Sequence, residues 1–257
     1  MQPASSSQSA TKPLRGMLLT AAKSYQDVLK IIADRNGDFT ATERAHALQK
    51  LAQSTNNATA DQILGITKDS NVSLLQKRVW KDISENLNQA IAADANSSIS
   101  IATTVTSSSS GSIKAAACSR ASGSALEVDS ETLASVLWAA GTLRTKSDIQ
   151  NIALSNLGPF LEKINNDSWQ ANDLVRVVWG LARLRGEGAR SLLEGNLARL
   201  ATNLVDDMSP SQLSKLAWAF ASARAGSSIL NAIGDSIVDR GDAGTFFYFL
   251  LLRFNLI

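Results

Sequence analysis

The hydrophobic residues of this chain recur at the three- and four-residue spacing of an α-helix over most of its length. The segment SYQDVLKIIADR, which begins at Ser24, places Tyr25, Val28, Leu29 and Ile32 on one apolar stripe. Similar stripes follow in residues 40–53 and 71–94. No stretch of useful length alternates apolar and polar residues in the manner of a β-strand. The pattern therefore predicts an all-α protein.

Three segments in the second half of the chain can be superposed: LASVLWAAGTLR (133–144), LVRVVWGLARLR (174–185) and LSKLAWAFASAR (213–224). Their tryptophans, Trp138, Trp179 and Trp218, lie 41 and 39 residues apart. A polar turn and a second amphipathic segment follow each of them. A helix pair thus repeats about every 38–41 residues. Such repeats are typical of an α-solenoid, in which antiparallel helix pairs stack in tandem.

Composition and periodicity divide the chain into five parts. We expect a disordered segment in 1–23, a degenerate helical repeat region in 24–93, a Ser/Ala-rich flexible insertion in 94–125, three helical-hairpin repeats in 126–240 and an apolar tail in 241–257. The first segment carries Lys12, Arg15 and Lys23, several serines and no acid before Asp27. This composition is typical of an organellar transit peptide, with an ordinary disordered terminus as the alternative.

The tail ends in TFFYFLLLRFNLI, which is too short to cross a bilayer. It is either a final buried helix or, as we favour, the start of a truncated fourth repeat. No apolar run elsewhere reaches the roughly 18 residues that a membrane span needs, so we expect none.

Residue counts argue against an enzyme. The chain of 257 residues has one cysteine, Cys118, and one histidine, His46. These two residues cannot build a disulfide or a Cys/His metal cluster, and no glycine-rich phosphate loop or nucleophile with a partner is evident. We therefore expect no catalytic residue, metal or cofactor. The formal charge of +2 says little about partners.

Polar residues gather on a narrow sector of each tryptophan helix when it is projected at about 100° per residue. The three sets are Asp173, Arg176, Gly180 and Arg183; Thr132, Ser135, Ala139 and Thr142; and Gln212, Lys215, Ala219 and Ser222. A small residue lies in the middle of each set. The sector is either a solvated face or the wall of a ligand groove, in which Gly180 leaves room for a base or sugar between Arg176 and Arg183.

The tryptophans and the arginines that follow them each admit two roles. A tryptophan at the border of the polar sector is either a packing wedge between repeats or a platform on which a base stacks. Arg144, Arg185 and Arg224 lie six residues beyond the tryptophans, at the end of the helix. There they either interact favourably with the helix dipole and hydrogen-bond to free carbonyls, or they contact phosphates.

The segments SPSQLSKLAWAFASARAG (209–226) and NDLVRVVWGLARLR (172–185) resemble the octotricopeptide-type repeat of algal organelle proteins. They are also similar to repeats of the FAST-kinase/RAP proteins and the apicomplexan heptatricopeptide proteins. The shared core is carried by Leu133, Leu137, Trp138 and Ala139; by Leu174, Val178, Trp179 and Gly180; and by Leu213, Ala217, Trp218 and Ala219. The likeness covers about 110 residues, but the proline-rich end of the second helix and a RAP domain are missing.

This resemblance implies a protein that binds single-stranded RNA in an organelle, with the chloroplast slightly favoured over the mitochondrion. It would act in RNA processing, stability or translation, together with other proteins of an RNA-processing complex. Repeat helices can present varied polar groups to one base per repeat. However, residues 129–240 hold 11 Lys/Arg and 12 Asp/Glu. This balance keeps open an alternative, a protein-binding α-solenoid that serves as a scaffold in a larger assembly.

Overall fold

The computed structural model describes residues 18–35, 37–55, 58–102, 129–144, 148–163, 169–242 and 244. Throughout these ranges the regular elements are helices and none is a strand, which confirms the all-α prediction. The first half contains α2 (Tyr25–Arg35), α3 (Ala41–Ser54), α4 (Ala60–Lys68) and α5 (Ser70–Ala102). The second half contains α6 (Ser130–Leu143), α7 (Asp148–Lys163), α8 (Ala171–Leu184), α9 (Glu187–Leu192), the π-helical turn η2 (Leu193–Leu197), α10 (Ala198–Leu204), the short 3₁₀ turn η3 (Val205–Asp207), α11 (Pro210–Ala223) and α12 (Ser227–Arg240).

Side-chain caps fix the starts of two of the three tryptophan helices, α6 and α11. The Asp129 carboxylate accepts the Thr132 backbone N–H of α6 at 2.7 Å. In α11, Ser209 and Gln212 form a reciprocal capping box, and Pro210 takes the first helical position. Proline suits that position because its missing N–H would have had no partner. The sequence alone predicts this start, since Ser209 followed by Pro210 is typical of an N-cap and a first helical residue, and the structure confirms it.

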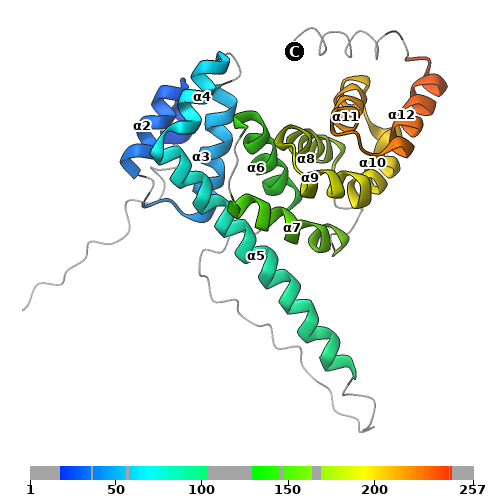
Figure 1. The fold of residues 1–257 in the computed structure, drawn as a ribbon, viewed down its shortest axis with the longest axis horizontal. Coiled ribbons are helices and arrows are strands. Elements are labelled where there is room, and N and C mark those ends of the chain that lie inside the picture. Colours follow the sequence, from blue (N-terminus) through cyan, green and yellow to red (C-terminus); the bar gives the residue numbers. More distant parts are fainter. Residues whose placement is uncertain are drawn as a thin grey trace, which may run out of the picture.

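The helices form two rows (Figure 1). In the first row α3 contacts α6, α6 contacts α8, and α8 contacts α11. In the second row α5 contacts α7, α7 contacts α9, and α10 contacts α12. The rows also contact each other, for example α8 with α9 and α11 with α12. The three tryptophan helices are therefore neighbours, with α3 in the place before them.

The helices α6 and α8 approach each other backbone to backbone. A Cβ atom added at Gly180 would lie 2.3 Å from the carbonyl oxygen of Leu137. One added at Gly141 would lie 2.7 Å from the carbonyl oxygen of Gly180. Only glycine permits so short a separation. This contact sets the distance between the first two tryptophan helices.

Two segment boundaries differ from those that composition predicted. Helix α5 continues through Ala102, past residue 93. Residues 18–21 are helical and Leu19 is fully buried, although the expected disordered segment ran to residue 23. The proposed transit peptide up to residue 17, the insertion from residue 103 and the apolar tail from residue 245 lie outside the described residues.

Candidate functional site

The three tryptophans of the repeats form a continuous row across α6, α8 and α11, here called the tryptophan ladder. The ring centroids of Trp138 and Trp179 are 6.5 Å apart with the rings stacked at 28°. Those of Trp179 and Trp218 are 6.4 Å apart at 37°. Such separations lie within the range of favourable aromatic pairs. Each indole is half-buried, so each combines packing with an exposed part.

Two arginines of α8 lie over indole rings of the ladder. The guanidinium of Arg176 is 5.8 Å from the centroid of Trp138, on the preceding helix. That of Arg183 is 4.7 Å from the centroid of Trp179, one turn earlier on its own helix. Arg183 also donates its Nε–H to the backbone oxygen of Gly141 at 3.1 Å. Both cations are thus held on the ladder by cation–π contact.

A buried acid accompanies these cations. The Asp173 side chain is 10% exposed, and its carboxylate lies 3.8 Å from Nη1 of Arg176. Burial raises the pKa of Asp173 above its ordinary value, while the charge of Arg176 opposes that rise and the charge of Glu131 adds to it. Desolvation therefore outweighs the attraction of the arginine at this position.

The middle of the polar sector does not form a groove. Gly180, Ala139 and Ala219 are all buried. At Gly180 the Leu137 backbone occupies the space that the sequence interpretation gave to a base or sugar, so that interpretation was wrong. The absence of a side chain at Gly180 lets α6 and α8 approach each other. What remains accessible is the polar residues at the ends of the sectors, apart from the buried Asp173 and Ser135.

The other predicted site residues differ in their burial and in their hydrogen bonds. On α6, Ser135 is buried, Thr132 and Thr142 are half-buried, and the Thr142 hydroxyl donates to Trp138 O at 2.9 Å. On α11, Gln212 is used in the capping box, and the exposed Ser222 donates to Ala219 O at 3.0 Å. Lys215 is half-buried on the same helix. The cations that the structure places on rings of the ladder are therefore those of α8.

Arg144, Arg185 and Arg224 share an unusual backbone geometry. Each ends its tryptophan helix in the left-handed region, with φ of 51°, 48° and 53°. Among the described residues they are the only non-glycine residues with positive φ. All three are exposed. The sequence predicted their position at the helix end but not this conformation, because arginine gives no local signal for it.

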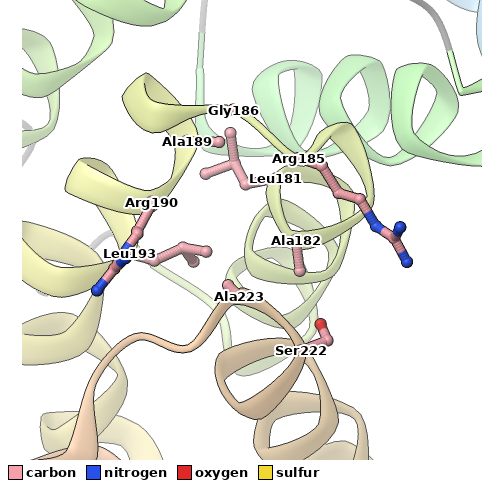
Figure 2. Close-up of a pocket in the computed structure, with 9 residues that line it drawn as sticks. All are labelled: Leu181, Ala182, Arg185, Gly186, Ala189, Arg190, Leu193, Ser222 and Ala223. Atoms are coloured by element: carbon pink, nitrogen blue, oxygen red, sulfur yellow. The ribbon is translucent and has the colours of Figure 1, made fainter.

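A pocket of about 520 Å³ opens between the ends of α8 and α11 and the start of α9 (Figure 2). Its apolar lining includes Leu181, Leu193 and Ala223, and its polar lining includes Arg185, Arg190 and Ser222. Figure 2 shows the two arginine side chains on opposite sides of it. Sequence reasoning missed this pocket, because its residues come from α8, α9, η2, α11 and the α8–α9 connection and share no spacing.

The described part of the chain offers no group of three or more His, Cys, Asp or Glu residues that could hold a metal ion. Within the same residues, no helix is both long enough and apolar enough to cross a membrane. A scan against protein-family models gives no match, and no curated protein matches the sequence.

Proposed function

We propose that this chain is an RNA-binding helical-repeat protein, an α-solenoid of tandem antiparallel helix pairs that holds single-stranded RNA along its tryptophan ladder. The observation that carries the proposal is the ladder itself, with Arg176 and Arg183 placed on its rings. Half-exposed aromatic rings beside cations on one face are the means by which many proteins bind single strands without reading every base.

The stacked guanidiniums suit phosphate better than free side chains would. Stacking on an indole orders the guanidinium plane, and a planar guanidinium recognises phosphate oxygens through the N–H groups at its edge. Less conformational entropy is then lost on binding. Lys215, on the next helix of the row, adds a cation of the same face. A strand that crosses the helices would meet these groups in succession.

The overall charge limits how such a strand is held. Residues 129–240 carry 11 Lys/Arg against 12 Asp/Glu, so bulk attraction supplies nothing. Binding rests instead on local cations. We therefore expect the affinity to fall only modestly with salt, with a slope of log affinity against log salt of roughly −0.7 per phosphate contact for a single strand.

The biological setting follows from the repeat resemblance. We propose an organellar location, with the chloroplast favoured over the mitochondrion, and a role in RNA processing, stability or translation. Non-catalytic binding, with further proteins of an RNA-processing complex as partners, fits the polar and aromatic side chains along the ladder.

The test measures binding of a fluorescent single-stranded RNA pool as salt is varied, for the wild type and for Arg176→Gln/Arg183→Gln. We expect the double variant to bind at least tenfold more weakly near 0.1 M salt, because about two phosphate contacts are lost. Glutamine is used because glutamate at 176 would face the buried Asp173 carboxylate. A melting curve checks that loss of the Arg183 bond to Gly141 has not unfolded the protein.

Arg199→Gln is the matched control, since Arg199 is exposed on α10 in the second row. If this control weakens binding as much as the double variant, binding is diffuse and the ladder is not the site. If the wild type ignores single-stranded RNA but retains a protein partner with little response to salt, the scaffold alternative replaces the proposal.

A further inference from the structure

Three equivalent left-handed arginines require an explanation beyond helix capping. Arg144, Arg185 and Arg224 adopt positive φ, where glycine is the least strained residue. The backbone makes the cap: the N–H groups of Arg144 and Arg224 donate to carbonyls of the preceding turn. Glycine would make the same bonds. The side chain, and not the cap, therefore accounts for arginine at these positions.

The side chains themselves have no protein partner in the described part of the chain. All three arginines are exposed, and none forms an ion pair or side-chain hydrogen bond with a described residue. A cation near a helix C-terminus also favours the dipole. On α8 Arg183 already lies within the last turn and needs no left-handed backbone, whereas α6 and α11 have no other basic residue in that turn. All three left-handed arginines are exposed to solvent.

The three cations lie along one edge of the first row. Trp138 stacks on Trp179, and Gly141 contacts Gly180, so α6 and α8 run in register. The pocket joins the end of α8 to the end of α11, next to Arg224. Six residues separate each tryptophan from its arginine, about 9 Å along the helix at 1.5 Å per residue. The edge therefore runs beside the tryptophan ladder.

The pocket adds an apolar surface beside Arg185 and next to the C-terminal end of α11. Leu181, Leu193 and Ala223 line it, with Arg185 and Arg190 on opposite sides (Figure 2). Its volume of about 520 Å³ is in the range of sites for small organic ligands. A nucleotide matches this chemistry, because its base is flat and largely apolar on its faces while its phosphate is anionic.

We propose that the C-terminal ends of α6, α8 and α11 form a backbone-binding edge. On it Arg144, Arg185 and Arg224 each hold one phosphate of a single strand. The pocket between α8 and α11 holds the nucleotide that lies between Arg185 and Arg224. This inference rests on the proposed function. It adds where the sugar-phosphate backbone runs.

The test compares the wild type with Arg144→Gly/Arg185→Gly/Arg224→Gly in binding to single-stranded RNA as salt is varied. Losing three phosphate contacts should lower the slope of log affinity against log salt by about 2, and the affinity by about 100-fold near 0.1 M salt. The melting temperature should stay the same or rise, because glycine relieves the left-handed strain. The corresponding triple lysine variant should keep most of the slope.

The charge-matched control is Lys30→Gln/Lys77→Gln/Arg199→Gln, three exposed cations on α2, α5 and α10. It should leave the slope nearly unchanged. Ala223→Leu, which fills the pocket, should weaken binding without changing the slope, because no charge is removed.

The outcomes separate this inference from the proposed function. If the glycine variant binds with an unchanged slope while the Arg176→Gln/Arg183→Gln variant loses binding, the edge is wrong and the ladder stands. If the glycine variant melts well below the wild type, the arginines are structural and the edge is overturned. If the wild type binds no single-stranded RNA, both proposals fail.

Discussion

Replacing Gly180 with alanine tests the contact that positions the tryptophan helices. The new Cβ would lie 2.3 Å from Leu137 O, whereas ordinary contact begins near 3.4 Å. Helix α8 would therefore have to move away from α6 by about 1 Å. Because the opposing atoms are backbone, no side chain can rotate to relieve the clash.

Two effects of opposite sign decide the magnitude. Overpacking a close contact costs about 1–3 kcal/mol, occasionally more, and a backbone clash belongs at or above the upper end. Alanine stabilises the helix by about 1 kcal/mol relative to glycine through its greater helix propensity. We expect Gly180→Ala to lower the free energy of unfolding by about 2 kcal/mol. For a chain of this size the melting temperature would fall by roughly 4–8 °C.

The assay is urea and thermal unfolding, with near-ultraviolet circular dichroism to report the stacked indoles of the ladder. Gly234→Ala is the matched control, because Gly234 lies in α12 with nothing within 4 Å of its added Cβ. The free energy of unfolding of that variant should be about 0.5–1 kcal/mol higher than that of the wild type. The reasoning is refuted if Gly180→Ala is as stable as the wild type or matches the gain of Gly234→Ala.

Three further substitutions probe the ladder, the buried acid and the first half of the chain. Trp179→Ala should lower the free energy of unfolding, measured in urea, by about 3 kcal/mol, the lower end for a large truncation because the ring is half-exposed. Unchanged stability with weakened RNA binding would show that the tryptophan is a stacking platform and not a packing wedge. Burial raises the folded-state pKa of Asp173, so stability should fall as pH rises from the unfolded value of 3.8 through the folded pKa. Asp173→Asn should lack this pH dependence, so that it is more stable than the wild type above this pH window and equally stable below it. Parallel pH profiles of stability for the two proteins would contradict the assignment. Asp82→Ala removes the paired hydrogen bonds that Arg44 donates at 2.8 and 2.9 Å, and should cost about 2 kcal/mol in the same unfolding assay; a loss below about 0.5 kcal/mol would show that the pair is solvent-screened.

Local periodicity made much of the secondary structure predictable. The apolar stripe of a helix and the cap formed by Ser209 and Pro210 depend on residues close in sequence, so both could be inferred. Breaks inside a helix were harder. The second helix of the middle repeat, expected as one segment, is divided at Gly195, which has non-helical φ and ψ of −96° and −113°. Helix α4 was not predicted, because its apolar stripe is short.

The site was less predictable, since it depends on contacts between repeats. A helical projection separates polar from apolar residues, but it cannot tell a small residue beside a groove from one that lets two helices meet. Gly180 was misassigned for that reason. The left-handed conformation of Arg185 and its equivalents also escaped prediction, because arginine has no intrinsic preference for it. The stacking of the three tryptophans followed only from the register of neighbouring helices.

Photocrosslinking of bound single-stranded RNA, followed by mass spectrometry of the attached peptides, tests the central claim most directly. The account predicts crosslinked peptides from α6, α8 and α11, centred on Trp138, Trp179 and Trp218, and their loss when unlabelled RNA or high salt competes. Crosslinks confined to α2–α5 or to the second row, or no crosslinks at all, would contradict it.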